Sequence, residues 1–362
     1  MNSLSVDFFL GANSEHGFFS HFDQLQDPYS DFQTFIIKAG PGTGKSTMMK
    51  KLARRYADRE RLVERVHCSS DPDSLDGVIL HDNRIQIVDG TPPHVMEPRF
   101  AAAGETILSF YPAFCEKELR KHRLEIAQTS SVISGFHRRF CELLRCANLL
   151  LDSNAALIRK SLNQPKLERA VQGILKRELS HKKKQEEMGL AKTRLVSAFT
   201  PKGLITYQDT INTLCGKVYL LDDEYRVCSH LFLSMVRDAV LKAGYDCYVC
   251  YSPFHPDTQI DQVLIPDLGL GFVTRSRFLP LEQVHANKVI HATRFFDREI
   301  LRQKKQRLSF CRKTAAAILE EALEALAQAK AAHDVLEEFY APNVDFSVVD
   351  QITEEFFNRL EA

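Results

Sequence analysis

Residues 39–47, AGPGTGKST, place three glycines, a lysine and hydroxyl side chains in one short stretch. The glycines allow a tight curl in which successive backbone amides point inward and can bind phosphate oxygens. Lys45 adds a fixed positive charge to this curl. The pattern is G-x-x-x-x-G-K-[ST] with Ala39 in place of the first glycine, and it predicts a phosphate-binding loop, or P-loop.

Each polar residue of this loop has an expected role. Lys45 should reach the β- and γ-phosphates, Ser46 should bind Mg²⁺, and Thr47 should donate to the α-phosphate. ATP is the expected nucleotide, because the Asn287–Lys288 pair is followed by Val and Ile and lacks the aspartate of a guanine-binding motif. The residues expected to hold ATP are Gly40, Pro41, Gly42, Thr43, Gly44, Lys45, Ser46 and Thr47.

The segments on both sides of the loop have the patterns needed to position it. FIIK (35–38) is a short apolar run, typical of a buried parallel strand. After the loop, apolar residues recur at Met48, Met49, Leu52 and Tyr56, which is helical spacing. The sequence therefore predicts a strand, the loop and a helix in succession, with the helix N-terminus and its positive dipole end at the phosphate.

A second carboxylate is needed beside the loop to hold the metal. RIQIVDG (84–90) predicts a strand that ends in Asp89, at the sheet edge where ligands of open α/β sheets bind. Asp89 and Ser46 are thus the expected metal ligands, and Lys45 and Asp89 the expected catalytic residues. Alternatively, Asp89 only opens the turn DGTPP, in which case Asp76 or Asp82 replaces it.

The residues that would activate a nucleophile are less well defined. No glutamate follows Asp89, which weakens the case for fast hydrolysis and favours a kinase or a nucleotide sensor. His94, after the Pro-Pro turn, is either a residue that approaches a γ-phosphate or an ordinary surface or packing residue. The sequence does not choose among the arginines that could complete the site, which are Arg99, Arg120, Arg123, Arg138 and Arg139.

The second part of the chain resembles the first. Gly17 aligns with Gly203 at an offset of 186, and Asp76 with Asp261 at an offset of 185. Near-constant spacing of several blocks in one order indicates a duplicated unit. The aligned blocks are 11–25 with 197–211, 35–47 with 218–230, 68–80 with 250–265, and 85–91 with 270–276.

The duplicated loop has lost the features that bind phosphate. Asp222, Asp223 and Glu224 align with Ala39, Gly40 and Pro41, and Cys228 aligns with Lys45. Three carboxylates would oppose a polyphosphate in a partly desolvated pocket. We therefore expect a degenerate half that binds no nucleotide, associates with the first half as an intramolecular pseudo-dimer, and contributes a side chain such as Arg226 or Arg275.

Each half is expected to continue into helices. Residues 114–188 read as helical, and residues 319–340 carry an apolar face whose expected antiparallel partner is 298–313. The charged stretch 176–194 reads as the region between the halves. The expected fold is α/β, with two tandem P-loop NTPase-like (Rossmann-like parallel sheet) halves at 1–190 and 191–362, each followed by a helical hairpin.

Composition limits the possible partners and setting. The 362 residues include 47 Lys plus Arg and 47 Asp plus Glu, so no net charge recruits nucleic acid or an anionic membrane. No apolar run approaches the roughly 20 residues of a spanning helix. The nine cysteines form no framework, and Cys247 and Cys250 are expected to be structural, which fits a reducing cytoplasm.

GPGTGKST (40–47) resembles the nucleotide loop of AAA-type ATPases, although the Asp-Glu pair and sensor motifs of that family are not evident. The chain as a whole resembles an uncharacterised family of bacterial tandem P-loop proteins labelled ATPase. The resemblance rests on Gly17–Phe18, on this loop, and on CSSDPDSLDGV (68–78) and VDGTPPHVMEP (88–98). It implies ATP binding and a P-loop fold in each half, but it brings no substrate.

Three functions are compatible with these patterns. The first is a Mg·ATP-binding P-loop ATPase that hydrolyses ATP slowly in its N-terminal half. The second is a kinase that passes the γ-phosphoryl group to an unidentified small acceptor. The third is a nucleotide-sensing interaction protein without catalysis, whose bound state changes the packing of the two halves and whose protein partner is unidentified.

Overall fold

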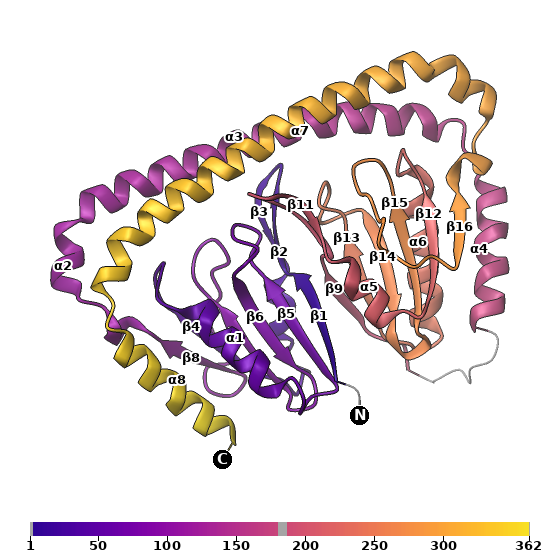
Figure 1. Ribbon diagram of the computed structural model, residues 1–362. Helices are drawn as coiled ribbons and strands as arrows, with labels where there is room; N and C mark the ends of the chain where they lie inside the picture. The colour runs from indigo at the N-terminus through magenta and orange to yellow at the C-terminus, as the bar shows by residue number, and fades with distance from the viewer. Residues whose placement is uncertain (1–2, 180–186, 362) are drawn as a thin grey trace. The chain divides into compact units, whose positions relative to one another are not determined.

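The computed structural model describes residues 3–179 and 187–361 and contains two six-stranded sheets with helices on their faces (Figure 1). The chain forms two compact units. The first comprises Met1–Cys141, Phe199–Leu204 and Leu323–Ala362, and the second comprises Glu142–Ala198 and Ile205–Ala322. Each unit is therefore assembled from segments that are distant in the sequence.

The first sheet has the strand order β1-β5-β6-β7-β4-β8. Its neighbours pair in parallel except around β6, which runs antiparallel to both β5 and β7. The start of β6 therefore lies at the edge where the other strands end. The strands are β1 (Leu4–Phe9), β4 (Gln33–Lys38), β5 (Leu62–His67), β6 (Leu75–Leu80), β7 (Ile85–Asp89) and β8 (Glu105–Ser109).

The second sheet repeats this topology in the order β9-β13-β14-β15-β12-β16, with β14 again the antiparallel strand. Asp76 and Asp261, aligned by sequence, are the second residues of β6 and β14. These strands are β9 (Ala191–Arg194), β12 (Lys217–Asp222), β13 (Cys247–Tyr251), β14 (Ile260–Ile265), β15 (Leu270–Arg275) and β16 (Lys288–His291).

A short hairpin accompanies each sheet, β2 (Gly11–Ser14) with β3 (Gly17–Ser20), and β10 (Ser197–Thr200) with β11 (Gly203–Thr206). The two aligned turn glycines have nearly the same positive φ, 108° at Gly17 and 102° at Gly203. Because the hairpins, the strand order and the strand directions all recur, the expectation of two similar α/β halves is confirmed.

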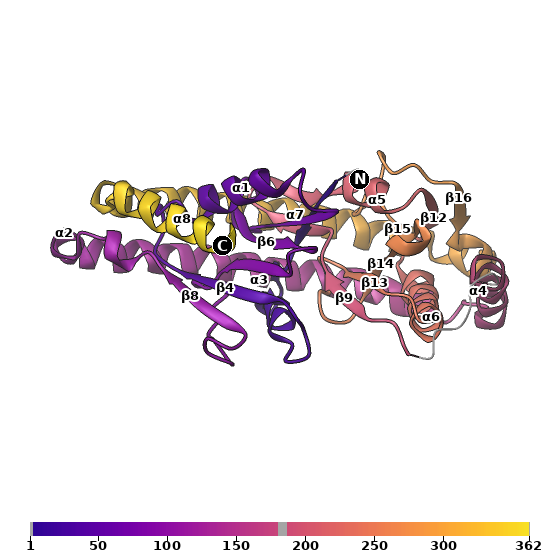
Figure 2. The ribbon, with the colours of Figure 1, turned by 90° about the horizontal axis from the view of Figure 1, so that it is seen from below.

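Alternating side chains of β4 build the core on both faces of the first sheet. Phe35 and Ile37 pack on one face and Ile36 on the other, and all three are fully buried, as the apolar run predicts. Helices α1 (Lys45–Tyr56) and α8 (Phe346–Glu361) cover the Phe35 face and lie side by side (Figure 2). The other face packs under η1 (Phe22–Gln26).

Two long helices replace the expected hairpins. Residues 298–313 and 319–340 form one continuous helix, α7 (Arg298–Tyr340), so the predicted antiparallel pairing of these two segments is wrong. The intervening TAAAI (314–318) contains no glycine or proline that would end a helix. The partner of α7 is instead α3 (Arg123–Arg159): His122, just before α3, contacts Phe339 in the first unit, and Asn154 bonds to Leu308 in the second.

The remaining predictions for the connections are partly borne out. The segment 114–188 is helical in α2, α3 and α4, while its residues 180–186 lie outside the described part. Residues 191–194, expected in an inter-half linker, form the edge strand β9.

None of the described helices combines the length and apolar character needed to cross a membrane. The remaining helices are α2 (Glu116–Lys121), α4 (Gln164–Leu179), α5 (Gln208–Leu214), α6 (Val227–Lys242), η2 (Tyr111–Ala113), η3 (Pro266–Leu268), η4 (Ala292–Phe295) and η5 (Ala341–Asn343).

Candidate functional site

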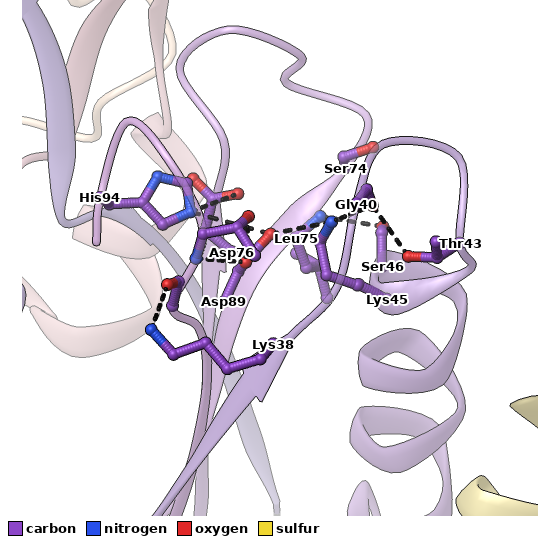
Figure 3. A network of polar contacts seen from close by, with 12 residues as sticks. Lys38, Gly40, Thr43, Lys45, Ser46, Ser74, Leu75, Asp76, Asp89 and His94 are labelled. Carbon is purple, nitrogen blue, oxygen red and sulfur yellow. Dashed lines mark hydrogen bonds and ion pairs between the residues drawn. The ribbon is translucent and has the colours of Figure 1, made fainter. Parts of the chain in front are cut away.

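The glycine loop, residues 39–44, connects the end of β4 to the start of α1 (Figure 3). Gly42 and Gly44 have φ values of 64° and 82°, which glycine adopts without strain. Gly44 is the N-cap of α1, and no side chain caps this helix end. The first backbone amides of α1 therefore keep the capacity to donate to an anion.

Lys45, the first residue of α1, lies between the loop and Asp89. Its Nζ donates to the Gly40 carbonyl at 2.7 Å and lies 3.5 Å from Asp89 Oδ2. The adjacent Ser46 Oγ accepts a hydrogen bond from the Leu75 amide at 3.0 Å. The structure thus brings together the three residues expected to bind phosphate and metal. Thr43 is buried and donates to the Gly40 carbonyl, whereas Thr47 is exposed on the first turn of α1.

Asp89 ends β7, which pairs directly with β4, so its carboxylate is next to the loop. Its Oδ1 accepts from the Thr91 amide at 2.9 Å and the Thr91 hydroxyl at 2.6 Å. Burial alone would raise the pKa of Asp89, but the interactions with His94, Lys45 and Thr91 outweigh it and lower this pKa to about 2. Asp89 is therefore a buried, ionised carboxylate, and it opens the Thr91 turn as well as facing the lysine.

His94 is a site residue that sequence reasoning left open. It is buried, and its Nε2 lies 3.7 Å from Asp76 Oδ1 and 3.8 Å from Asp89 Oδ2. Neither ring nitrogen has a hydrogen-bond partner among the described residues. Phe22 stacks on the ring at a centroid distance of 5.2 Å. Burial lowers the pKa of His94, but the two carboxylates raise it by a larger amount. The net pKa is therefore above its ordinary value.

Of the two alternative carboxylates, only Asp76 belongs to the site. It lies at the start of the antiparallel strand β6 and so reaches the edge where β7 ends. Burial raises the pKa of Asp76, an effect that His94 opposes. Asp82 follows the far end of β6 and instead accepts from Arg61 Nε at 2.7 Å.

Asp76, Asp89 and His94 form a buried cluster whose ligand atoms all lie within 4.8 Å of one another. Two carboxylates and an imidazole are groups that bind divalent metals. The same groups can also hold a proton between them, because the pKa values of Asp76 and His94 are raised while that of Asp89 is lowered. The cluster lies next to Lys45, so either chemistry would act at the mouth of the glycine loop.

The C-terminal segment packs on the glycine loop, which the sequence did not indicate. A Cβ added at Gly42 would lie 3.6 Å from Ala341 Cβ and 3.7 Å from Glu337 Cβ. A Cβ at Gly40 would lie 3.3 Å from the Tyr340 ring. Apolar spacing in the sequence indicates the amphipathic face of α7, but it does not show which surface that face covers.

The equivalent loop of the second half, residues 223–226, has four residues where the first has six (39–44). Helix α6 therefore begins at Val227, so Val227 rather than Cys228 occupies the helix position of Lys45, and the expected Cys228 equivalence is wrong. Arg226 takes the left-handed conformation of Gly44, with φ 57°.

Side chains of the protein occupy this second loop. The buried Asp223 carboxylate accepts from the Ser229 amide in the first turn of α6 at 2.9 Å. Burial raises the pKa of Asp223, against the effect of the backbone amides of Ser229 and Cys228. A carboxylate of the chain thus takes helix amides that could otherwise donate to a phosphate.

The arginines proposed to complete the site from the second half bond within their own unit. Arg226 Nη2 donates to both carboxylate oxygens of Asp261 at 2.8 Å. Arg275 Nη2 lies 3.2 Å from Asp222. Among the other arginine candidates, Arg120 pairs with Glu116. Cys247 and Cys250 are both buried in β13 without a disulfide, in agreement with a structural role.

Comparison of the chain with protein-family models, with curated proteins and with solved structures gives no match.

Proposed function

We propose that the first unit binds Mg·ATP at the glycine loop and hydrolyses it slowly. The observation that carries this proposal is the position of Lys45 at the start of an uncapped helix, 3.5 Å from the ionised carboxylate of Asp89. The loop amides and the helix N-terminus supply donors for phosphate oxygens. Lys45 supplies a positive charge that can exchange its Gly40 contact for the β- and γ-phosphates.

The oxygen atoms beside Lys45 fit a hard divalent cation. Asp89 is ionised, with a pKa of about 2. Among the described residues, Ser46 Oγ accepts one hydrogen bond, from Leu75, which leaves a second lone pair for a metal. Mg²⁺ prefers such oxygen ligands and is commonly bound through one or two protein groups plus substrate phosphates. When bound, the metal would neutralise charge on the phosphates.

The chain contains no glutamate directly after Asp89, where glycine stands at position 90. His94, whose Nε2 lies 3.8 Å from Asp89 Oδ2, is a group that could hold a proton beside the loop. Burial lowers the pKa of His94, but the two carboxylates raise it by more, and the net shift favours the charged imidazolium, which cannot accept a proton. This arrangement supports slow rather than fast hydrolysis.

A phosphate-release assay tests the proposal. With Mg·ATP and no added acceptor, the wild-type protein should release phosphate, and Lys45→Ala should not. Turnover that requires a small-molecule acceptor would show a kinase instead. ATP binding without turnover under either condition would show a nucleotide sensor. Absence of ATP binding by the folded protein would overturn all three.

A further inference from the structure

A pocket of about 420 Å³ lies beside the glycine loop. One wall is residues 112–115, which follow β8, the strand paired with β4 on the side opposite β7. The other wall is residues 342–345 with Val348, at the start of α8. The walls are joined by backbone hydrogen bonds from Cys115 to Asn343 at 2.9 Å and from Asp345 to Ala113 at 2.8 Å.

Aromatic side chains join this pocket to the glycine loop. A Cβ added at Gly40 would lie 3.0 Å from Phe114 Cζ, and one at Gly44 would lie 4.0 Å from Phe346 Cε1. Phe346 is nevertheless 47% exposed, and Tyr111, edge-on to Phe114 at 5.6 Å, is 60% exposed. Phe346 and Tyr111 are next in the chain to the lining residues Asp345 and Pro112, so these exposed rings are close enough to contact a ligand in the pocket.

We infer that this pocket binds the purine base of the nucleotide whose phosphates occupy the glycine loop. The inference rests on the proposed function and adds the element that recognises the base. A phosphate chain held by the loop amides and Lys45 leaves the nucleoside at the end of the loop away from Asp89, and β8 leads into the pocket on that side.

The chemistry of the pocket suits a flat, partly polar ring. Phe346 and Phe114 provide faces on which a base can stack. The Asn343 side chain donates from Nδ2 to the Phe339 carbonyl at 2.9 Å, and its Oδ1 accepts no hydrogen bond from the described residues. This oxygen is an acceptor for the exocyclic amine of the base. Asn343 and Phe346, near the C-terminal end of the given sequence, would therefore set the base preference of the glycine loop at residues 39–44.

The test compares ATP with inorganic tripolyphosphate, which has the phosphates but no base. Isothermal titration calorimetry would be carried out with Mg²⁺ on the full chain, on Phe346→Ala, and on Phe310→Ala as a matched control. Phe310 is 65% exposed on α7 in the second unit, so its removal should change neither affinity. The wild type should bind ATP more tightly than tripolyphosphate. Phe346→Ala should weaken ATP binding about tenfold, in the range for loss of one stacked base, and leave tripolyphosphate binding unchanged.

Two results would overturn the inference. One is an ATP affinity unaltered by Phe346→Ala, and the other is equal wild-type affinity for ATP and tripolyphosphate. Failure of the wild type to bind either ligand would instead refute the proposed function. A parallel loss of both ligands in Phe346→Ala would mean that the side chain supports the loop rather than the base, and would also reject the inference.

Discussion

Lys45 Nζ and Asp89 Oδ2 lie 3.5 Å apart, from the first turn of α1 and the end of β7. Both groups are largely buried, with side-chain exposures of 14% and 9%. A buried pair of opposite charges stays ionised through mutual attraction, and here that attraction helps to lower the pKa of Asp89 to about 2. In the proposed function, Lys45 would face the phosphates and Asp89 would face the metal.

Asp89→Asn should separate the binding of ATP from its turnover. The loop and Lys45 remain, so ATP affinity should change little, while the loss of the carboxylate should lower Mg²⁺-dependent turnover by about a hundredfold. Steady-state phosphate release and calorimetry on the same samples measure the two effects. Asp82→Asn, at the opposite end of β6 and bonded to Arg61, is the matched control. Normal turnover in Asp89→Asn with a defect in Asp82→Asn would mean that the wrong carboxylate has been assigned.

His94 should make the stability of the metal-free protein depend on pH. Its pKa is raised in the folded state, so it stabilises the fold fully below its unfolded pKa of about 6.5. This contribution should be lost as the pH rises through the higher folded pKa. Chemical denaturation in EDTA at a series of pH values, for wild type and His94→Gln, measures it.

The difference in unfolding free energy between wild type and His94→Gln should therefore be largest in mild acid and shrink in alkali. A difference that is constant, or that grows with pH, would show that folding does not raise the pKa of His94. His94→Gln also removes the ring on which Phe22 stacks, but that loss does not depend on pH, so the pH dependence of the difference reports the charge.

The second loop should bind no nucleotide, and the chain should bind one ATP. Asp223 already accepts from a helix amide there, and no lysine is present between residues 222 and 230. Calorimetry should give a stoichiometry of one ATP per chain for the wild type and for Cys228→Ala. Two sites in the wild type, with one lost on substitution in residues 223–229, would refute the degenerate state of this loop.

Residues 1–190 alone should not form a stable first unit. Phe356 and Phe357 of α8 are buried in the core beneath β4, and Phe356 contacts Phe35 edge-on at 4.8 Å. In the full chain, Phe356→Ala should destabilise this unit by about 3–5 kcal/mol, measured by denaturant unfolding, whereas the exposed Phe310→Ala should have little effect. A cooperative unfolding transition and full ATP affinity in the 1–190 fragment would contradict this assignment.

The sequence predicted the parts of the site that are local in the chain. The strand, glycine loop and helix at 35–56 follow from apolar spacing and glycine positions, and Asp89 follows from the end of an apolar run. The repeat was visible because Gly17 and Gly203 have the same backbone requirement.

Other parts of the site depend on contacts that no local pattern encodes. Asp76 joins Asp89 only because β6 runs antiparallel, and strand direction is set by the partners that the whole sheet provides. The packing of Tyr340 and Phe346 on the loop depends on where a 43-residue helix ends in space. The loop before Val227 is two residues shorter than the glycine loop. The alignment of the two halves missed this difference because weakly similar sequence blocks do not show where a two-residue gap falls.

The measurement that tests the central claim most directly is calorimetric titration of Mg·ATP into wild type, Lys45→Ala and Lys51→Ala. Lys51 lies on the same helix and pairs with Asp350 at the surface, so its removal leaves the loop intact. We predict saturable binding in wild type and Lys51→Ala, and in Lys45→Ala a loss of at least about tenfold, because a charge-assisted contact contributes roughly 1.5–3 kcal/mol. Undiminished ATP affinity in a Lys45→Ala protein whose circular dichroism is unchanged would contradict the assignment of residues 39–47 as the nucleotide site.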